Sequence, residues 1–235
     1  RIGLFGIIGR DAQTDTPFAK PVTFADHVET SKRMATLLRE KEKVDLVVCL
    51  SHTGTSPVKK RSEDELLAQA VPDIDVIISG HTHTVLAAPI VVGKTIIVSA
   101  GSYGEYLGRL TLDWQKQTGA ALAGYDLIPV TSQIQDDPGL SRIIARFKQD
   151  IDRGYLATTG YRFDQIVAES PFDMETLEYA ETHPGETGIG DLITDAFRYA
   201  IRRAEGPRYE HVHVTVQPLG NIRGSFLKGP ISVDD

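Results

Sequence analysis

The stretch at residues 73–83, Asp-Ile-Asp-Val-Ile-Ile-Ser-Gly-His-Thr-His, constrains the fold more than any other part of the chain. Its β-branched centre at 76–78 is too short for a helix and predicts a buried strand. Gly80 lets the chain turn sharply at the end of that strand, and His81 and His83 follow directly. Such a pair can aim two imidazoles at one metal ion or serve only in surface hydrogen bonds, and this stretch alone leaves both interpretations open.

A second strand end of the same kind lies upstream. Residues 44–50 are apolar nearly throughout, as expected for a strand covered on both faces, and the run ends at Ser51 and His52. A helix that begins with a capping box at Ser62 and ends before Pro72 separates the two strands. Because neighbouring parallel strands end at the same edge of a sheet, we expect His52, His81 and His83 to lie on one rim.

Three neutral imidazoles can hold one divalent ion and leave a position open for water, the arrangement that a hydrolytic metal site needs. A site with two ions also needs carboxylates to offset their repulsion. Asp73 and Asp75 precede the strand and should lie at its opposite end, roughly 15 Å away at the rise of a strand. Ser51 and His52 are not expected to act as nucleophile and base, because adjacent residues of an extended chain point apart.

Composition and charge narrow the choice of partners and surroundings. The formal net charge of −7 argues against a nucleic-acid polymer as the partner, and no apolar run approaches the ~20 residues of a membrane span. Cys49 is the only cysteine, which excludes an internal disulfide and a thiolate zinc cluster. The first residue is Arg1 and the last segment has no closing element, so we expect a piece of a longer protein, incomplete at both ends.

The remaining elements follow from periodicity and from helix and turn signals. A helix is expected with its N-terminal cap at Thr23, and a later one opens at Pro138 with an apolar stripe. The expected elements are a helix over 24–42, an antiparallel meander over 90–130, a linker helix from 136 to about 154, a strand over 165–168, a helix over 187–204 and a strand over 212–216.

Four motifs, taken together, resemble a known family. They are Leu50-Ser51-His52, Ser79-Gly80-His81-Thr82-His83, the segment 100–110 (Ala-Gly-Ser-Tyr-Gly-Glu-Tyr-Leu-Gly-Arg-Leu) and the segment 186–196 (Glu-Thr-Gly-Ile-Gly-Asp-Leu-Ile-Thr-Asp-Ala). In this order they resemble the bacterial bifunctional metallophosphatase/5′-nucleotidase family of calcineurin-like metallophosphoesterases. The resemblance covers nearly the whole chain.

The resemblance implies an α/β (α+β) fold in three parts. Residues 1–132 would be the C-terminal part of an αββα metallophosphoesterase sandwich, the catalytic domain. Residues 133–160 would be a linker helix. Residues 161–235 would be the N-terminal part of a 5′-nucleotidase-type α/β domain that binds substrate.

The resemblance also implies an activity, the hydrolysis of nucleotide phosphates by a metal-bound hydroxide. Two divalent ions (Zn, Mn, Fe or Co) would take part, with His52 and His81 as ligands of one ion and His83 as a ligand of the other. The remaining ligands and the catalytic residues belong to Asp-x-His, Gly-Asp and Gly-Asn-His-Asp/Glu motifs, which are expected upstream of Arg1. The partner would be a small phosphate ester, a nucleotide, and the location periplasmic or extracellular.

In the second part, Arg223 matches the arginine with which this family contacts substrate. Arg203 is a second candidate, although a solvated charge near a helix C-terminus explains it equally well. Pro218 and Asp191 stand where the family has asparagine, which leaves nucleotide specificity open. The alternatives are a related two-metal hydrolase with a non-nucleotide or cyclic-nucleotide ester as substrate, or a catalytically incomplete fragment without activity.

Overall fold

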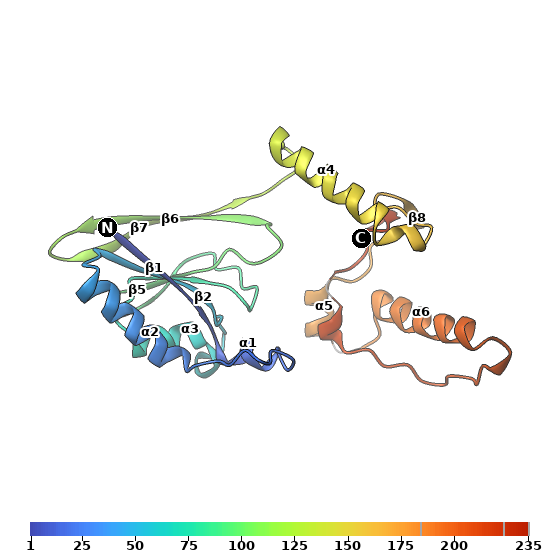
Figure 1. Cartoon of the computed structure of the whole chain (residues 1–235), viewed down its shortest axis with the longest axis horizontal. Helices are drawn as coiled ribbons and strands as arrows, with labels where there is room; N and C mark the ends of the chain where they lie inside the picture. Colours follow the sequence, from blue (N-terminus) through green and yellow to red (C-terminus); the bar gives the residue numbers. More distant parts are fainter. Residues whose placement is uncertain (184, 223, 235) are drawn as a thin grey trace. The chain divides into compact units, whose positions relative to one another are not determined.

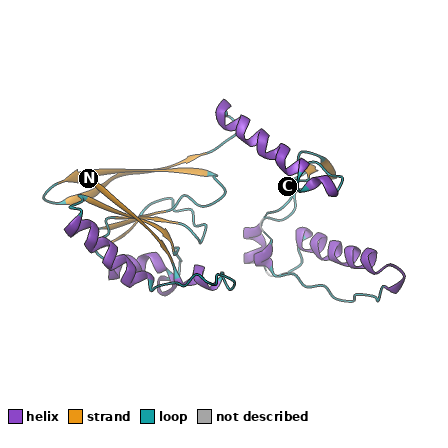
Figure 2. Cartoon of the chain, in the orientation of Figure 1, coloured by secondary structure: helices purple, strands orange, loops and turns teal. Residues whose placement is uncertain are grey.

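The chain folds into a mixture of helices and strands that divides into two compact units, Arg1–Gln135 and Asp136–Asp235 (Figures 1 and 2). The computed structural model describes residues 1–183, 185–222 and 224–234. In this part of the chain no helix is both long enough and apolar enough to cross a bilayer.

The first unit is built on a five-stranded sheet in the order β1-β2-β3-β5-β4. The first four of these strands are parallel, and β4 runs antiparallel to β5. The strand bounds are β1 (Ile2–Ile8), β2 (Leu46–His52), β3 (Val76–Ser79), β4 (Ile90–Val92) and β5 (Thr95–Val98). In the register of β2 and β3, Ser51 pairs with Ser79, so the two strands end within one residue of each other at their carboxyl ends.

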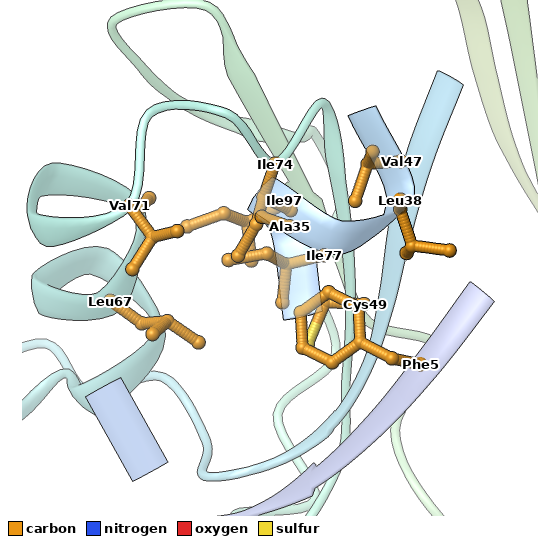
Figure 3. Close-up of a cluster of buried hydrophobic side chains, with 11 residues drawn as sticks. Phe5, Ala35, Leu38, Val47, Cys49, Leu67, Val71, Ile74, Ile77 and Ile97 are labelled. Carbon is orange, nitrogen blue, oxygen red and sulfur yellow. The ribbon is translucent and has the colours of Figure 1, made fainter. Parts of the chain in front are cut away.

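Helices cover one face of this sheet. They are α2 (His27–Thr36), which continues as a π-helical turn over Leu37–Lys41, and α3 (Glu63–Ala70), while the short α1 (Arg10–Thr14) follows β1 and a 3-10 turn spans Lys59–Arg61. Burial of apolar side chains between helices and sheet is the main stabilising contribution here. Figure 3 shows this core, which consists of Phe5, Ala35, Leu38, Val47, Cys49, Leu67, Ala68, Val71, Ile74, Ile77 and Ile97.

The other side of the sheet carries a long hairpin of β6 (Tyr106–Gln115) and β7 (Gly119–Pro129) (Figure 1). Trp114 Nε1 donates to the carbonyl of Asp45 at 3.3 Å, and the hydroxyl of Tyr125 donates to the carbonyl of Ser99 at 3.0 Å. The meander expected over 90–130 is therefore only partly correct. Its first two strands extend the main sheet, and the last two pair only with each other among the described residues.

The expectation that the central strands are covered on both faces is also only partly correct. The side chains that point away from the helices remain 46–49% exposed at Leu50 and Ile78 of the central strands, and 60–65% exposed at Ile2 and Leu4 of the edge strand β1. An apolar run shows that a strand is suited to burial on both faces, but how much of the second face an element such as the β6–β7 hairpin covers depends on the tertiary structure.

Two helix starts differ from the expectation. The helix predicted over 24–42 begins at His27, and its cap is Asp26, whose carboxylate accepts from the backbone N–H of Glu29 at 2.9 Å. Thr23 lies before the helix, because Asp26 supplies the oxygen that accepts a free N–H of the first turn. Ser62 precedes α3 as predicted, but its side chain makes no capping bond.

The second unit contains α4 (Pro138–Arg153), β8 (Ile166–Ser170), α5 (Leu177–Thr182), α6 (Gly188–Glu205) and β9 (Gly229–Ser232), with 3-10 turns at Leu156–Thr158, Gly206–Arg208 and Leu219–Asn221. The strands β8 and β9 form an antiparallel pair. The helices predicted to begin near Pro138 and Thr187 are confirmed. The strand predicted over 212–216 is wrong, because alternating residues make a strand only where a neighbouring strand accepts their backbone hydrogen bonds, and none of the described residues does so there.

Candidate functional site

His52 and His81 lie next to each other at the carboxyl edge of the parallel sheet. His52 is the last residue of β2, and His81 follows β3 after one glycine. Their ring centroids are 5.0 Å apart with the rings tilted by 58°. A metal ion binds about 2 Å from each ligating imidazole nitrogen, so this separation allows both rings to bind one divalent ion. The donor chemistry of the pair fits zinc, manganese or iron.

The turn that carries His81 has an uncommon backbone conformation. His81 and His83 have φ angles of +69° and +54°, a region that residues other than glycine seldom occupy. The turn is held against the loop after β2, because Gly80 N–H donates to the carbonyl of Ser51 at 2.9 Å. A Cβ added to Gly54, in that loop, would lie 2.4 Å from the Thr82 methyl group, so the close approach of the two loops needs a glycine there.

His83 is oriented differently from the other two. Its side chain is exposed, and its ring packs edge-on against Tyr103 with centroids 5.5 Å apart. Within the described ranges, no group of three or more histidine, cysteine, aspartate or glutamate side chains is placed to hold a metal ion. The structure thus brings together two of the three histidines that the sequence singled out.

A carboxylate that the sequence reasoning missed approaches the pair. Asp11 Oδ2 lies 3.2 Å from His81 Nε2. Asp11 sits in α1, whose N-terminus is held by Glu63, since the Glu63 carboxylate accepts the backbone N–H groups of Arg10 at 2.9 Å and of Asp11 at 3.3 Å. The signal was available, because α1 directly follows the carboxyl end of β1 and so must emerge at the same sheet edge as His52.

A second missed carboxylate, Asp64, lies beneath the rim and is fully buried. It accepts hydrogen bonds from hydroxyl groups at the ends of β2 and β3. Asp75 is also buried, but at the opposite end of β3, where it accepts the N–H of Val47 at 2.7 Å and pairs with Arg39. That position agrees with the expectation that Asp73 and Asp75 lie away from the histidines.

A small cavity of about 280 Å³ opens beside the two histidines. Its lining consists of Ile8, Ala12, Asp15, Thr16, Phe24, His52 and His81. The mixture of apolar walls and a few polar groups is typical of sites that orient a small molecule.

The second unit holds the predicted arginines and a larger cavity. Arg223 lies outside the described residues. Arg203 is exposed in the last turn of α6, where its Nη1 lies 3.1 Å from the Tyr199 hydroxyl and its guanidinium carbon 5.8 Å from the centre of that ring. A cavity of about 580 Å³ adjoins the start of α6, with Thr187, Asp191 and Gln217 in its wall. The described residues that line it do not include Arg203.

The chain is similar in sequence to proteins named as nucleotide phosphoesterases and 5′-nucleotidases. No family model matches it. It is 26% identical over 240 residues to the trifunctional nucleotide phosphoesterase protein YfkN of Bacillus subtilis, covering 100% of this chain and 15% of that protein. It is 26% identical over 257 residues to the 5′-nucleotidase of Diplobatis ommata, covering 100% of this chain and 41% of that protein.

A solved structure shares the fold of the chain. The 5′-nucleotidase precursor from Thermus thermophilus superimposes with a TM-score of 0.76 at 24% identity, covering 100% of this chain and 45% of that one. The chain therefore spans less than half the length of each of these proteins. The resemblance and the α/β fold class expected from the sequence motifs are both confirmed.

Proposed function

We propose that this chain, a relative of 5′-nucleotidases and nucleotide phosphoesterases over its whole length, is part of a metal-dependent hydrolase of nucleotide phosphate esters. The observation that carries the proposal is the pair of imidazoles, His52 and His81, 5.0 Å apart at the carboxyl edge of a parallel sheet. Ligands in open α/β sheets bind at this edge, outside the ends of the strands.

The chain's own residues would bind a divalent ion and orient its imidazole ligands. His52 and His81 would hold a divalent ion, which when bound polarises the phosphate ester and activates water. Asp11 would orient His81, since an imidazole that donates from Nε2 to a carboxylate keeps Nδ1 free as a metal ligand. The neighbouring cavity, with His52 and His81 in its wall, would admit the reacting end of a small ester.

The finer expectations are part of this proposal. The enzyme would use two ions (Zn, Mn, Fe or Co), with His83 as a ligand of the second ion, and would act in the periplasm or outside the cell. The second unit would bind the nucleotide with Arg223, and the 580 Å³ cavity beside α6 gives that unit room for a ligand. Residues 1–132 would then be the catalytic part, 133–160 the linker and 161–235 the substrate-binding part.

The proposal is tested on the full-length protein by substituting His81. After removal of metal with EDTA and addition of Mn²⁺, we expect His81→Ala to lower kcat/KM for 5′-AMP by on the order of 100-fold, because one imidazole ligand is lost. His211→Ala, which removes an exposed histidine of the second unit, is the matched control and should leave kcat/KM unchanged.

Substrate choice is tested in the same assay. A panel of 5′-nucleotides, 2′,3′-cyclic nucleotides and p-nitrophenyl phosphate separates a nucleotidase from a related two-metal hydrolase. The proposal is wrong if the full-length protein hydrolyses none of these esters with Zn, Mn, Fe or Co and if His81→Ala changes nothing. The same assay on a protein that consists only of residues 1–235 would show whether this piece is inactive in isolation.

A further inference from the structure

We propose that Asp64 is a positioning residue for the metal-binding histidines, because its buried carboxylate gathers hydroxyl groups from both of the strand ends that carry His52 and His81. The inference rests on the proposed function and extends it to a residue of α3 that lies beneath the site.

The contacts of Asp64 come from two strands and a loop. Oδ1 accepts from Ser51 Oγ and Thr53 Oγ1, each at 2.6 Å, and Oδ2 accepts from Ser79 Oγ. The backbone N–H of Asp64 donates to the carbonyl of Gly54 at 3.0 Å. One residue of α3 therefore contacts three segments: the strand β2, the loop that follows β2, and the strand β3.

The residues that Asp64 contacts lie next to the two histidines in the sequence. Ser51 and Thr53 directly flank His52, so both neighbours of that imidazole are fixed to the same carboxylate oxygen. Ser79 is the last residue of β3, two positions before His81. The carbonyl of Ser51 accepts from Gly80 N–H, which links the two strand ends directly. Displacement of Asp64 would move both imidazoles relative to each other.

The burial of the carboxylate makes these contacts sensitive to substitution. Asp64 has no exposed surface, and Ser51, Thr53 and Ser79 are buried as well. A buried charge is tolerated only when its hydrogen bonds are satisfied, and here hydroxyl donors satisfy both oxygens. Asparagine has the same shape, but its amide group presents two N–H donors where the aspartate accepts from Ser79 or from Ser51 and Thr53. The hydroxyl groups at one strand end must then reverse from donors to acceptors, and the negative charge that strengthens all three hydrogen bonds is lost.

Asp75 provides the control that separates a positioning role from a purely structural one. It is also a buried aspartate that holds strand ends, through the N–H of Val47 and the guanidinium of Arg39, but it lies at the opposite end of β3. Asp75→Asn should lower the stability of the protein and leave the imidazoles in place. Asp64→Asn should lower stability and also move them.

The experiment uses full-length protein in three forms: wild type, Asp64→Asn and Asp75→Asn. In metal-free, histidine-labelled protein, we expect the ring resonances of His52 and His81 to shift in Asp64→Asn and to stay unchanged in Asp75→Asn. In calorimetric titrations with Mn²⁺, we expect the affinity of Asp64→Asn to fall by roughly 10- to 100-fold and that of Asp75→Asn to remain at the wild-type value.

Ser79→Ala is the second variant, because it removes a single hydroxyl and little volume and so keeps the fold if Asp64→Asn does not. It should shift the His81 resonances in the same direction. The inference is overturned if the folded variants of Asp64 and Ser79 both keep the wild-type ring resonances and Mn²⁺ affinity. Failure of the proposed function looks different: wild-type protein would bind no Mn²⁺ and hydrolyse no ester, while the metal-free resonances would still respond to Asp64→Asn.

Discussion

At the scale of single residues, the contribution of an aspartate ion pair to stability depends on how far the carboxylate is buried. The carboxylate of Asp75 is 8% exposed and is paired with Arg39 and the backbone of Val47. The carboxylate of Asp126 is 55% exposed and pairs with Arg109 at 2.9 Å on the β6–β7 hairpin. Removal of one member of a buried pair leaves the other charge uncompensated, whereas water solvates the charge that remains from an exposed pair.

We therefore expect Asp75→Ala to lower the free energy of unfolding by about 3 kcal/mol, because it leaves the Arg39 charge and the Val47 N–H without their partner. Asp126→Ala should cost less than about 1 kcal/mol. Urea unfolding of the two variants at neutral pH checks the difference. Equal losses would show that the buried pair contributes no more than a surface pair.

Cys49 provides a prediction about pH. Burial of the thiol, with the neighbouring Asp64 charge, raises its pKa from 9.0 to about 12. The unfolded chain therefore loses this proton at a lower pH than the folded chain does. The contribution of Cys49 to stability is complete below pH 9 and is lost as the pH rises toward 12. Urea unfolding between about pH 8 and pH 11 should show a steeper loss for wild type than for Cys49→Ala, and parallel curves would contradict the assignment.

At the scale of elements, helix starts in the second unit were predictable because their signals are local. Asp137 accepts from the N–H groups of Gly139 and Leu140 at 2.8 and 2.9 Å, with Pro138 in the first turn, as the Asp-Asp-Pro sequence indicates. The apolar stripe of α4 was also read correctly as a helical pattern. Its members remain 53–63% exposed in the structure, so the pattern gave the type of element and not its burial: Leu140, Ile143, Ile144 and Phe147.

Asp137→Ala should destabilise the second unit by about 1 kcal/mol, since two N–H groups of the first turn lose their acceptor. Asp136→Ala is the matched control, because this neighbouring carboxylate does not cap the helix. Circular dichroism during urea unfolding measures both. An equal effect of the two substitutions would mean that net charge near the helix start, and not the cap, matters.

At the scale of the whole molecule, the chain consists of two units joined through the residues after β7. Residues 130–137 are all exposed and lie between the end of β7 and the start of α4. Linkers of this kind are the preferred sites of proteolytic nicking. The boundary expected from the sequence at 132 lies within this segment, and the division into catalytic and substrate-binding parts stays a prediction.

Limited digestion with proteinase K should first cut within residues 130–137, because this segment is exposed throughout and lies outside the helices and strands. Mass spectrometry of the early fragments would then find two products close to the two units in length. A first cut inside the β6–β7 hairpin or inside α6 would contradict the assignment of the linker.

The sequence by itself determined the features that depend on neighbouring residues. Local pattern and capping chemistry predict the parallel strands that end at His52 and Ser79, the histidines at and after those ends, and the helices that begin after Asp137 and Thr187. Together with the motifs, these features were enough to predict the fold class and the resemblance to phosphoesterases.

Only the tertiary structure decided which side chains meet. Asp11 reaches His81 across 70 positions of the chain, and Asp64 gathers hydroxyls from two strands and a loop, contacts that depend on the register of the sheet and on the position of α3. For the same reason the sequence could not tell that His83 turns toward Tyr103. A pattern in the sequence fixes the edge at which a residue emerges, but packing between distant segments fixes the direction of its side chain.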